Sequence, residues 1–238
     1  MQGSLARATL AAILLLAPVL AQPQEHEPEG QKESILLVAA RHMQDLNFAR
    51  SVVLVMFPLD AGPSGVILNR PTDMMLRDIW PEHPERQGRT DTLYIGGPVN
   101  PNGLSFMFRM TPPPERAWWA VDDVYLSGDA DLLEVLLEDP EPDPEQRFFA
   151  GFAGWAPGQL EREIARGDWH VLRADDEVLY DAEPGTLWRR MYQRATLPRA
   201  GVGPVRGIQL THSACATTPT RPLVINGKTN QWQIPCSP

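Results

Sequence analysis

Residue types suited to binding a small anion gather in three short segments of the chain. Arg70, in Asn69-Arg70-Pro71, could bind a carboxylate or a phosphate with its planar guanidinium. Gly96-Gly97-Pro98 follows an apolar run, and successive glycines at a strand end can turn their N–H groups outward to cradle an anion. In Gly154-Trp155-Ala156-Pro157-Gly158-Gln159, free N–H groups at a helix start attract anions, and the indole could cover an apolar ligand. If these segments meet, they form a cleft whose candidate ligand-binding residues are Asn69, Arg70, Gly96, Gly97, Trp155 and Gln159.

Each segment also has a purely structural interpretation, which we favour for each segment taken by itself. Arg70 could form an ion pair with one of the many acidic groups of the chain. Paired glycines are typical of a tight turn whose backbone only glycine can adopt. Trp155 could pack into the core while Pro157 and Gly158 set the entry into a helix. A ligand-binding cleft formed by these three segments is therefore a hypothesis.

Signatures of catalysis are mostly missing from the sequence. Ser64 lies in Gly-Pro-Ser-Gly-Val, which lacks the second glycine of a nucleophile elbow. No P-loop occurs, and Gly201-Val-Gly203 has neither a preceding strand nor a later acidic residue to form a dinucleotide site. The histidines, at 26, 42, 83, 170 and 212, do not have metal-ligand spacing, and His42 near Asp45 is typical of a surface pair. We therefore expect no cofactor and no metal, and we favour a protein that is not an enzyme.

The charge distribution divides the chain into an acidic body and a basic tail. The 238 residues carry a formal net charge of −9. Residues 1–185 hold all 30 acidic groups and 14 basic ones, a balance of −16, whereas residues 186–238 hold seven basic groups and no acidic one. Such a body repels a phosphate backbone, and the tail has no recognisable motif for reading nucleic acid. We therefore expect a small anion or a protein as the partner, rather than a nucleic acid.

The N-terminal segment has the proportions of an export signal. A 14-residue apolar run at 8–21 follows Arg7, and it is shorter than the roughly 20 residues that a membrane-spanning helix needs. We expect cleavage before Gln22, a polar linker over 22–32 and no transmembrane span, which would place the protein in the periplasm or outside the cell. The alternative is a cytoplasmic protein that begins near Glu33.

Both cysteines of the chain lie in the basic tail. Cys215 and Cys236 are separated by 20 residues, and in an exported protein they can form a disulfide. A bridge over such a loop contributes about 3 kcal/mol in the chain-entropy model. Zinc binding is the alternative; His212 offers a third ligand, but no fourth is evident. We favour the disulfide if the chain is exported.

The apolar pattern predicts strands and helices that do not alternate strictly, which indicates an α+β fold. Residues 51–57 and 65–68 are expected to form a hairpin, because two apolar runs flank a short turn. After residue 196 no regular period is visible, and we interpret 196–238 as an appendage. The expected strands are 34–40, 51–57, 65–68, 93–95, 104–108, 117–120, 124–126, 147–152 and 169–172, and the expected helices are 74–80, 130–138, 157–167 and 186–193.

Four sequence motifs follow one another between residues 50 and 190. The first is Arg-Ser-Val-Val-Leu-Val at 50–55 with Gly-Val-Ile-Leu-Asn-Arg-Pro at 65–71, and the second is Tyr-Ile-Gly-Gly-Pro-Val at 94–99. The third reads Gly-Phe-Ala-Gly-Trp-Ala-Pro-Gly-Gln-Leu-Glu-Arg-Glu-Ile at 151–164, with Gly-Asp-Trp at 167–169, and the fourth is Leu-Trp-Arg-Arg at 187–190. In order and spacing they resemble the AlgH/YqgE family of bacterial proteins over residues 33–195.

The resemblance implies a single domain with a mixed, partly barrel-like sheet flanked by helices. The family carries a label of transcriptional regulation but no settled reaction, cofactor or catalytic residue. Members usually lack an export signal, so the N-terminus and the tail depart from the family pattern. Three hypotheses follow: a non-enzymatic binding or regulatory protein, an uncharacterised enzyme or small-anion sensor using the cleft, and a DNA-contacting transcriptional regulator. The expected organisation is a signal peptide at 1–21, a linker at 22–32, the domain at 33–195 and the basic appendage at 196–238.

Overall fold

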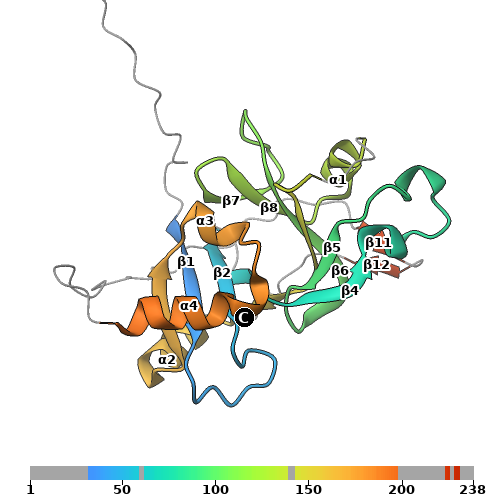
Figure 1. Ribbon diagram of the computed structural model, residues 1–238. Helices are drawn as coiled ribbons and strands as arrows, with labels where there is room; N and C mark the ends of the chain where they lie inside the picture. The colour runs from blue at the N-terminus through green and yellow to red at the C-terminus, as the bar shows by residue number, and fades with distance from the viewer. Residues whose placement is uncertain (1–31, 59–61, 139–142, 198–222, 226–227, 231–238) are drawn as a thin grey trace, which may run out of the picture.

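The computed structural model describes residues 32–58, 62–138, 143–197, 223–225 and 228–230. They form one ten-stranded sheet with flanking helices, and a separate two-stranded hairpin (Figure 1). The strands are β1 (Lys32–Ala39), β2 (Val52–Phe57), β3 (Ser64–Ile67), β4 (Pro71–Met75), β5 (Thr92–Ile95), β6 (Val99–Arg109), β7 (Trp118–Val121), β8 (Val124–Ser127), β9 (Arg147–Gly154), β10 (Trp169–Arg173), β11 (Leu223–Ile225) and β12 (Lys228–Asn230). The α-helices are α1 (Ala130–Leu136), α2 (Gln159–Arg166), α3 (Asp176–Leu179) and α4 (Pro184–Thr196), and 3₁₀ helices span Leu76–Ile79 and Pro84–Arg86.

The sheet is mixed and curls into a half-barrel. Its strand order is β10-β1-β2-β3-β9-β6-β8-β7, and β4 and β5 join it because β5 pairs with β9. The β5–β9 pairing is parallel, whereas the other pairings are antiparallel. β7 stands at one end of this order and yet lies close to β1 and β2, so the sheet curves back on itself. The expected α+β domain with a partly barrel-like sheet is confirmed.

β2 shows why the central strands read as continuous apolar runs. All six of its residues are buried, because both faces of the sheet are covered at this position. Val52, Leu54 and Met56 face the inside of the curl. Val53 and Phe57 pack on the opposite face with α2. β-Branched residues suit such a pleated, enclosed strand.

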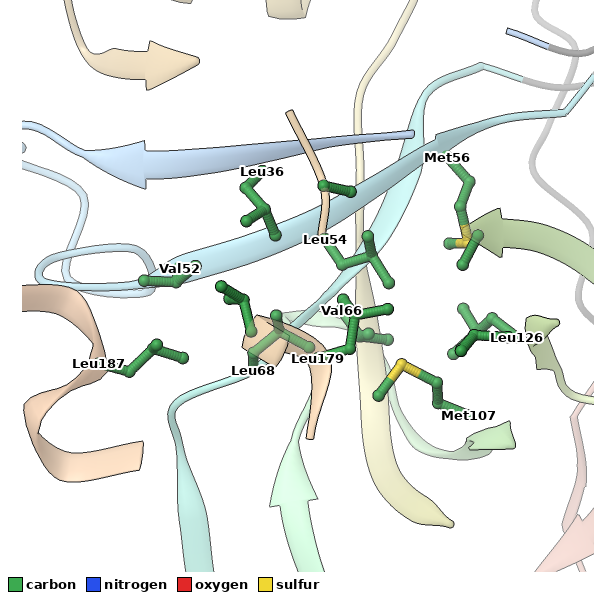
Figure 2. Packing of buried hydrophobic residues seen from close by; sticks show 14 of the residues in the cluster. Leu36, Val52, Leu54, Met56, Val66, Leu68, Met107, Leu126, Leu179 and Leu187 are labelled. Atoms are coloured by element: carbon green, nitrogen blue, oxygen red, sulfur yellow. The ribbon is translucent and has the colours of Figure 1, made fainter. Parts of the chain in front are cut away.

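The inside of the curl is filled by one hydrophobic cluster, which we call the inner core. It draws side chains from both halves of the sheet and is closed by α3 and α4, and Figure 2 shows its labelled residues converging on one space. Its buried members are Leu36, Val38, Val52, Leu54, Met56, Val66, Leu68, Tyr94, Met107, Ala120, Val124, Leu126, Phe149, Leu172, Ala174, Val178, Leu179, Leu187 and Met191.

Three elements differ from the sequence-based expectation. The helix expected at 74–80 is wrong: Met74 and Met75 end β4, and only a 3₁₀ turn follows. The short helix α3 was not expected. In the tail, β11 and β12 form an antiparallel hairpin that lies beside β6, so this part of the appendage returns to the domain (Figure 1). The expected signal peptide at 1–21 and the cysteines at 215 and 236 lie outside the described residues.

No helix in the part of the chain that the structure describes is long and apolar enough to cross a membrane.

Candidate functional site

Three of the six residues proposed as ligand-binding, Asn69, Arg70 and Trp155, contact the segment that links β1 to β2, which we call the 41–51 loop. The loop is built from turns, in which Phe48 and Ala49 donate their N–H groups to the carbonyl of Asp45. Asn69, just after β3, fastens the end of this loop. Its Oδ1 accepts the N–H of Val52 at 2.8 Å, and its Nδ2 donates to the carbonyl of Arg50 at 2.9 Å.

Arg70 also binds this loop, through backbone carbonyls. Its Nη2 donates to the carbonyl oxygen of Leu46 at 3.3 Å and to that of Ala49 at 3.2 Å. Burial lowers the pKa of the Arg70 guanidinium, and the nearby carboxylate of Asp45 partly offsets this effect. Nη2 of Arg70 therefore fastens the loop through two of its backbone carbonyls.

Gly96 and Gly97 let the turn between β5 and β6 lie directly against β9. A Cβ on Gly97 would lie 2.3 Å from the carbonyl carbon of Phe152, and one on Gly96 would lie 2.2 Å from the carbonyl oxygen of Gly151. The N–H of Gly96 donates to the carbonyl of Ala150 at 2.8 Å, so it is not free to bind an anion. Close approach to β9 therefore accounts for glycine at both positions.

Trp155 and Gln159 meet at the carboxylate of Glu163. Its Oε2 accepts the indole N–H groups of Trp155 and Trp169, each at 2.9 Å, and its Oε1 accepts Nε2 of Gln159 at 2.9 Å. Trp155 is 3% exposed and stacks on Phe48 of the 41–51 loop, with ring centroids 6.1 Å apart. The structural interpretation of Trp155 fits this packing.

The structure thus brings Asn69, Arg70 and Trp155 to the 41–51 loop. Gly96 and Gly97 pack against β9, and Gln159 binds Glu163. The backbone carbonyl of Arg70 accepts the N–H of Ile95 at 2.9 Å. Arg70 thus links the 41–51 loop to β5. Trp155 is joined to the same loop through Phe48. The polar side chains of Asn69, Arg70 and Gln159 all bond within the chain. Among the described residues, no group of three or more His, Cys, Asp or Glu side chains is placed to hold a metal ion.

A comparison with protein-family models matches residues 36–199 to the AlgH-like family. The chain belongs to the AlgH-like family. The match contains all four sequence motifs, and therefore the residues that hold the 41–51 loop. It supports the resemblance that the motifs suggested.

Individual AlgH-like proteins agree with this assignment. A UPF0301 protein of Mycobacteroides abscessus is 30% identical over 195 residues, covering 74% of this chain and 91% of that protein. A UPF0301 protein of Anaeromyxobacter is 35% identical over 175 residues, covering 69% and 88%. A crystal structure from Corynebacterium diphtheriae superposes with a TM-score of 0.56 at 28% identity, covering 74% of this chain and 91% of that one. The solution structure of AlgH from Pseudomonas aeruginosa gives 0.58 at 23% identity, covering 75% and 99%, which shows the shared fold.

Sequence reasoning missed the exposed apolar side chains beside the AlgH-like motifs. Leu46 lies on the 41–51 loop and is 86% exposed. Met74 on β4, Ile95 at the end of β5 and Val99 at the start of β6 are 48%, 44% and 40% exposed. The motif at 94–99 contained a signal for this exposure. Ile95 and Val99 flank the Gly-Gly-Pro turn, and they therefore lie at the ends of their strands rather than in the middle of an apolar run.

Proposed function

We propose that this AlgH-like chain is a non-enzymatic binding protein that docks a partner protein on an apolar surface built by its motif residues. The docking surface consists of Leu46, Met74, Ile95 and Val99. The observation that carries the proposal is the exposure of these four large apolar side chains. Arg70 forms hydrogen bonds with the backbones of Leu46 and Ile95, Met74 lies on the strand that follows Arg70, and Val99 begins the strand after Ile95. A contiguous exposed apolar patch is typical of an interaction site, and the proposal is that these four side chains act as one such patch.

Arg70 joins two parts of the docking surface that are distant in sequence. Its guanidinium binds the carbonyl of Leu46, and its own carbonyl binds the N–H of Ile95. The backbones of Leu46 and Ile95 are therefore both one hydrogen bond from a single residue. Val99 follows Ile95 across the turn that Gly96 and Gly97 allow. The polar groups of these motif residues form bonds within the chain. The motif residues can nevertheless contribute to partner binding, because they fix the positions of the apolar residues next to them.

The charges near this surface indicate the chemistry of the partner. Asp45 and Asp73 are exposed beside Leu46 and Met74, and the body as a whole is strongly acidic. A complementary partner has an apolar centre with basic residues around it. A second copy of this chain carries the same acidic groups, which would repel one another, so we propose a different protein as the partner.

Aspartate substitutions test this proposal. In affinity capture from the native host, Ile95→Asp and Leu46→Asp should each lower recovery of the partner about tenfold or more, because a charge is placed in the interface. Val135→Asp is the matched control, since Val135 is 55% exposed on α1, away from the motifs. Equal recovery by Ile95→Asp and Val135→Asp contradicts the proposal, as does recovery of this chain alone.

We also propose export and a disulfide between Cys215 and Cys236, because the apolar run at 8–21 is too short to span a membrane. The pairing of Leu223 with Asn230 supports the disulfide, since these two residues are close to Cys215 and Cys236 in the sequence. Mass spectrometry of the protein from its host should find a chain that begins at Gln22 with the two cysteines joined. An intact N-terminus with free thiols contradicts this.

A further inference from the structure

Arg147, the first residue of β9, is a buried cation without a carboxylate partner. It is 9% exposed, and its Nη2 donates to the backbone carbonyl of Asp181 at 2.5 Å. Its Nη1 has no hydrogen-bond partner in the described part of the chain, which likewise contains no carboxylate within ion-pair distance of the guanidinium. The charge lies 5.1 Å from the ring centre of Tyr94 and 5.9 Å from that of Tyr180.

Two other arginines of the same half of the molecule are neutralised. Arg89 is 1% exposed, and its guanidinium forms a two-pronged pair with Asp91 at 2.8 and 3.0 Å. Arg109 pairs with the carboxylates of Asp123, Glu145 and Asp176. A buried charge that has lost its partner is strongly destabilising. Arg147 therefore lacks the compensation that Arg89 and Arg109 receive.

A second unsatisfied donor stands beside this guanidinium. The Tyr180 hydroxyl is buried and has no hydrogen-bond partner among the described residues. Burial raises the pKa of Tyr180, so the phenol keeps the proton that it can donate. The Tyr180 ring is shared by two cations, since Arg109 lies 5.3 Å from its centre and Arg147 lies 5.9 Å from it.

The acidic groups near these donors are already engaged. Asp181 binds Arg190 at 2.6 Å, and Asp176 binds Arg109. The hydroxyl oxygen of Ser105 is a third buried polar atom without a partner in the described chain. It alternates along β6 with Phe106, which packs on the other face, and so it lies on the same side as Arg147 and the inner core.

We propose that Arg147 and Tyr180 bind a small oxyanion, a carboxylate or a phosphate, which supplies the missing counter-charge. Nη1 of Arg147 donates a charge-assisted hydrogen bond to it, and the Tyr180 hydroxyl donates a second. This site lies inside the curl of the sheet and does not depend on the docking surface.

The test follows thermal unfolding of the full chain while acetate or inorganic phosphate replaces chloride at constant ionic strength and pH. A ligand that binds only the folded state raises the unfolding midpoint and saturates. The wild type and the exposed-arginine control Arg189→Met should show this saturable rise with at least one of the two ions. Arg147→Met should show only the gradual, unsaturated response that salts exert on any protein. Tyr180→Phe should need about tenfold more of the same ion, because one hydrogen bond to a charged group is lost. Comparison of the acetate and phosphate series identifies which oxyanion is preferred.

Arg147→Met also tests the proposal without added oxyanion. In chloride it should be at least as stable as the wild type, because the substitution removes an uncompensated buried charge. A much lower midpoint would mean that the chain itself compensates the guanidinium, and would overturn the proposal. The same conclusion follows if wild type and Arg147→Met respond identically to both ions, or if Tyr180→Phe binds as the wild type does.

Discussion

Glu163 shows how one side chain organises a motif that the sequence could only suggest as a ligand site. Its two oxygens accept hydrogen bonds from two indoles and one amide, and so they tie α2 to the residues on either side of it. At the scale of residues, this carboxylate therefore engages the side-chain donors of Trp155 and Gln159 within the chain.

Glu163→Gln should therefore destabilise the fold although it changes few atoms. An amide has one acceptor oxygen, so at least one of the three donors around position 163 loses its partner. We expect a loss of about 1–3 kcal/mol in the free energy of unfolding, measured by urea denaturation.

Glu161→Gln, on the same helix, is the matched control. Its Oε2 is buried and has no partner in the described part of the chain, so loss of the charge should leave stability unchanged or raise it. Equal destabilisation by the two substitutions would contradict the role assigned to Glu163.

At the scale of elements, the sequence predicts strands that are buried on both faces, and it misses elements that depend on a few individual contacts. β2 was predictable because its apolar run is enclosed on both sides. β4 was missed because its residues are mostly exposed, and pairing with β5 rather than apolar pattern holds them. α3 has only four residues, too few to show a helical period. For the candidate site, residue types drew attention to Asn69, Arg70 and Gln159, but only the structure shows that their side chains form hydrogen bonds within the chain.

The 41–51 loop is an element whose order should depend on Arg70. Arg70→Met keeps much of the apolar stem and removes the donor to the carbonyls of Leu46 and Ala49. We expect faster amide hydrogen exchange at the turn N–H groups of Phe48 and Ser51, because local opening becomes easier.

Exchange in β2 serves as the internal reference for this measurement. Its amides lie in the buried centre of the sheet and should keep their protection in Arg70→Met. Uniformly faster exchange in both regions would mean global destabilisation, and unchanged exchange in the loop would show that Arg70 does not hold it.

At the scale of the whole molecule, one curled sheet separates two uses of its surface. The inner side carries the hydrophobic core with Arg147 and Tyr180 at one part of it, whereas the turn between β5 and β6 presents Ile95 and Val99 outward. Tyr94 and Ile95 are neighbours on β5, yet one is buried in the inner core and the other is exposed. Alternation along a single strand is thus enough to place a core residue next to a residue of the proposed docking surface.

Site-specific photocrosslinking in the native host tests the docking proposal most directly. A photoreactive residue in place of Ile95 should give a discrete adduct with another protein, whereas one in place of Val135 should give none. The adduct should fall strongly when Leu46→Asp is added to the Ile95 variant, because the proposal places both positions on the same surface. Adducts of equal yield from positions 95 and 135, or an adduct of this chain with its own copy, would contradict the account.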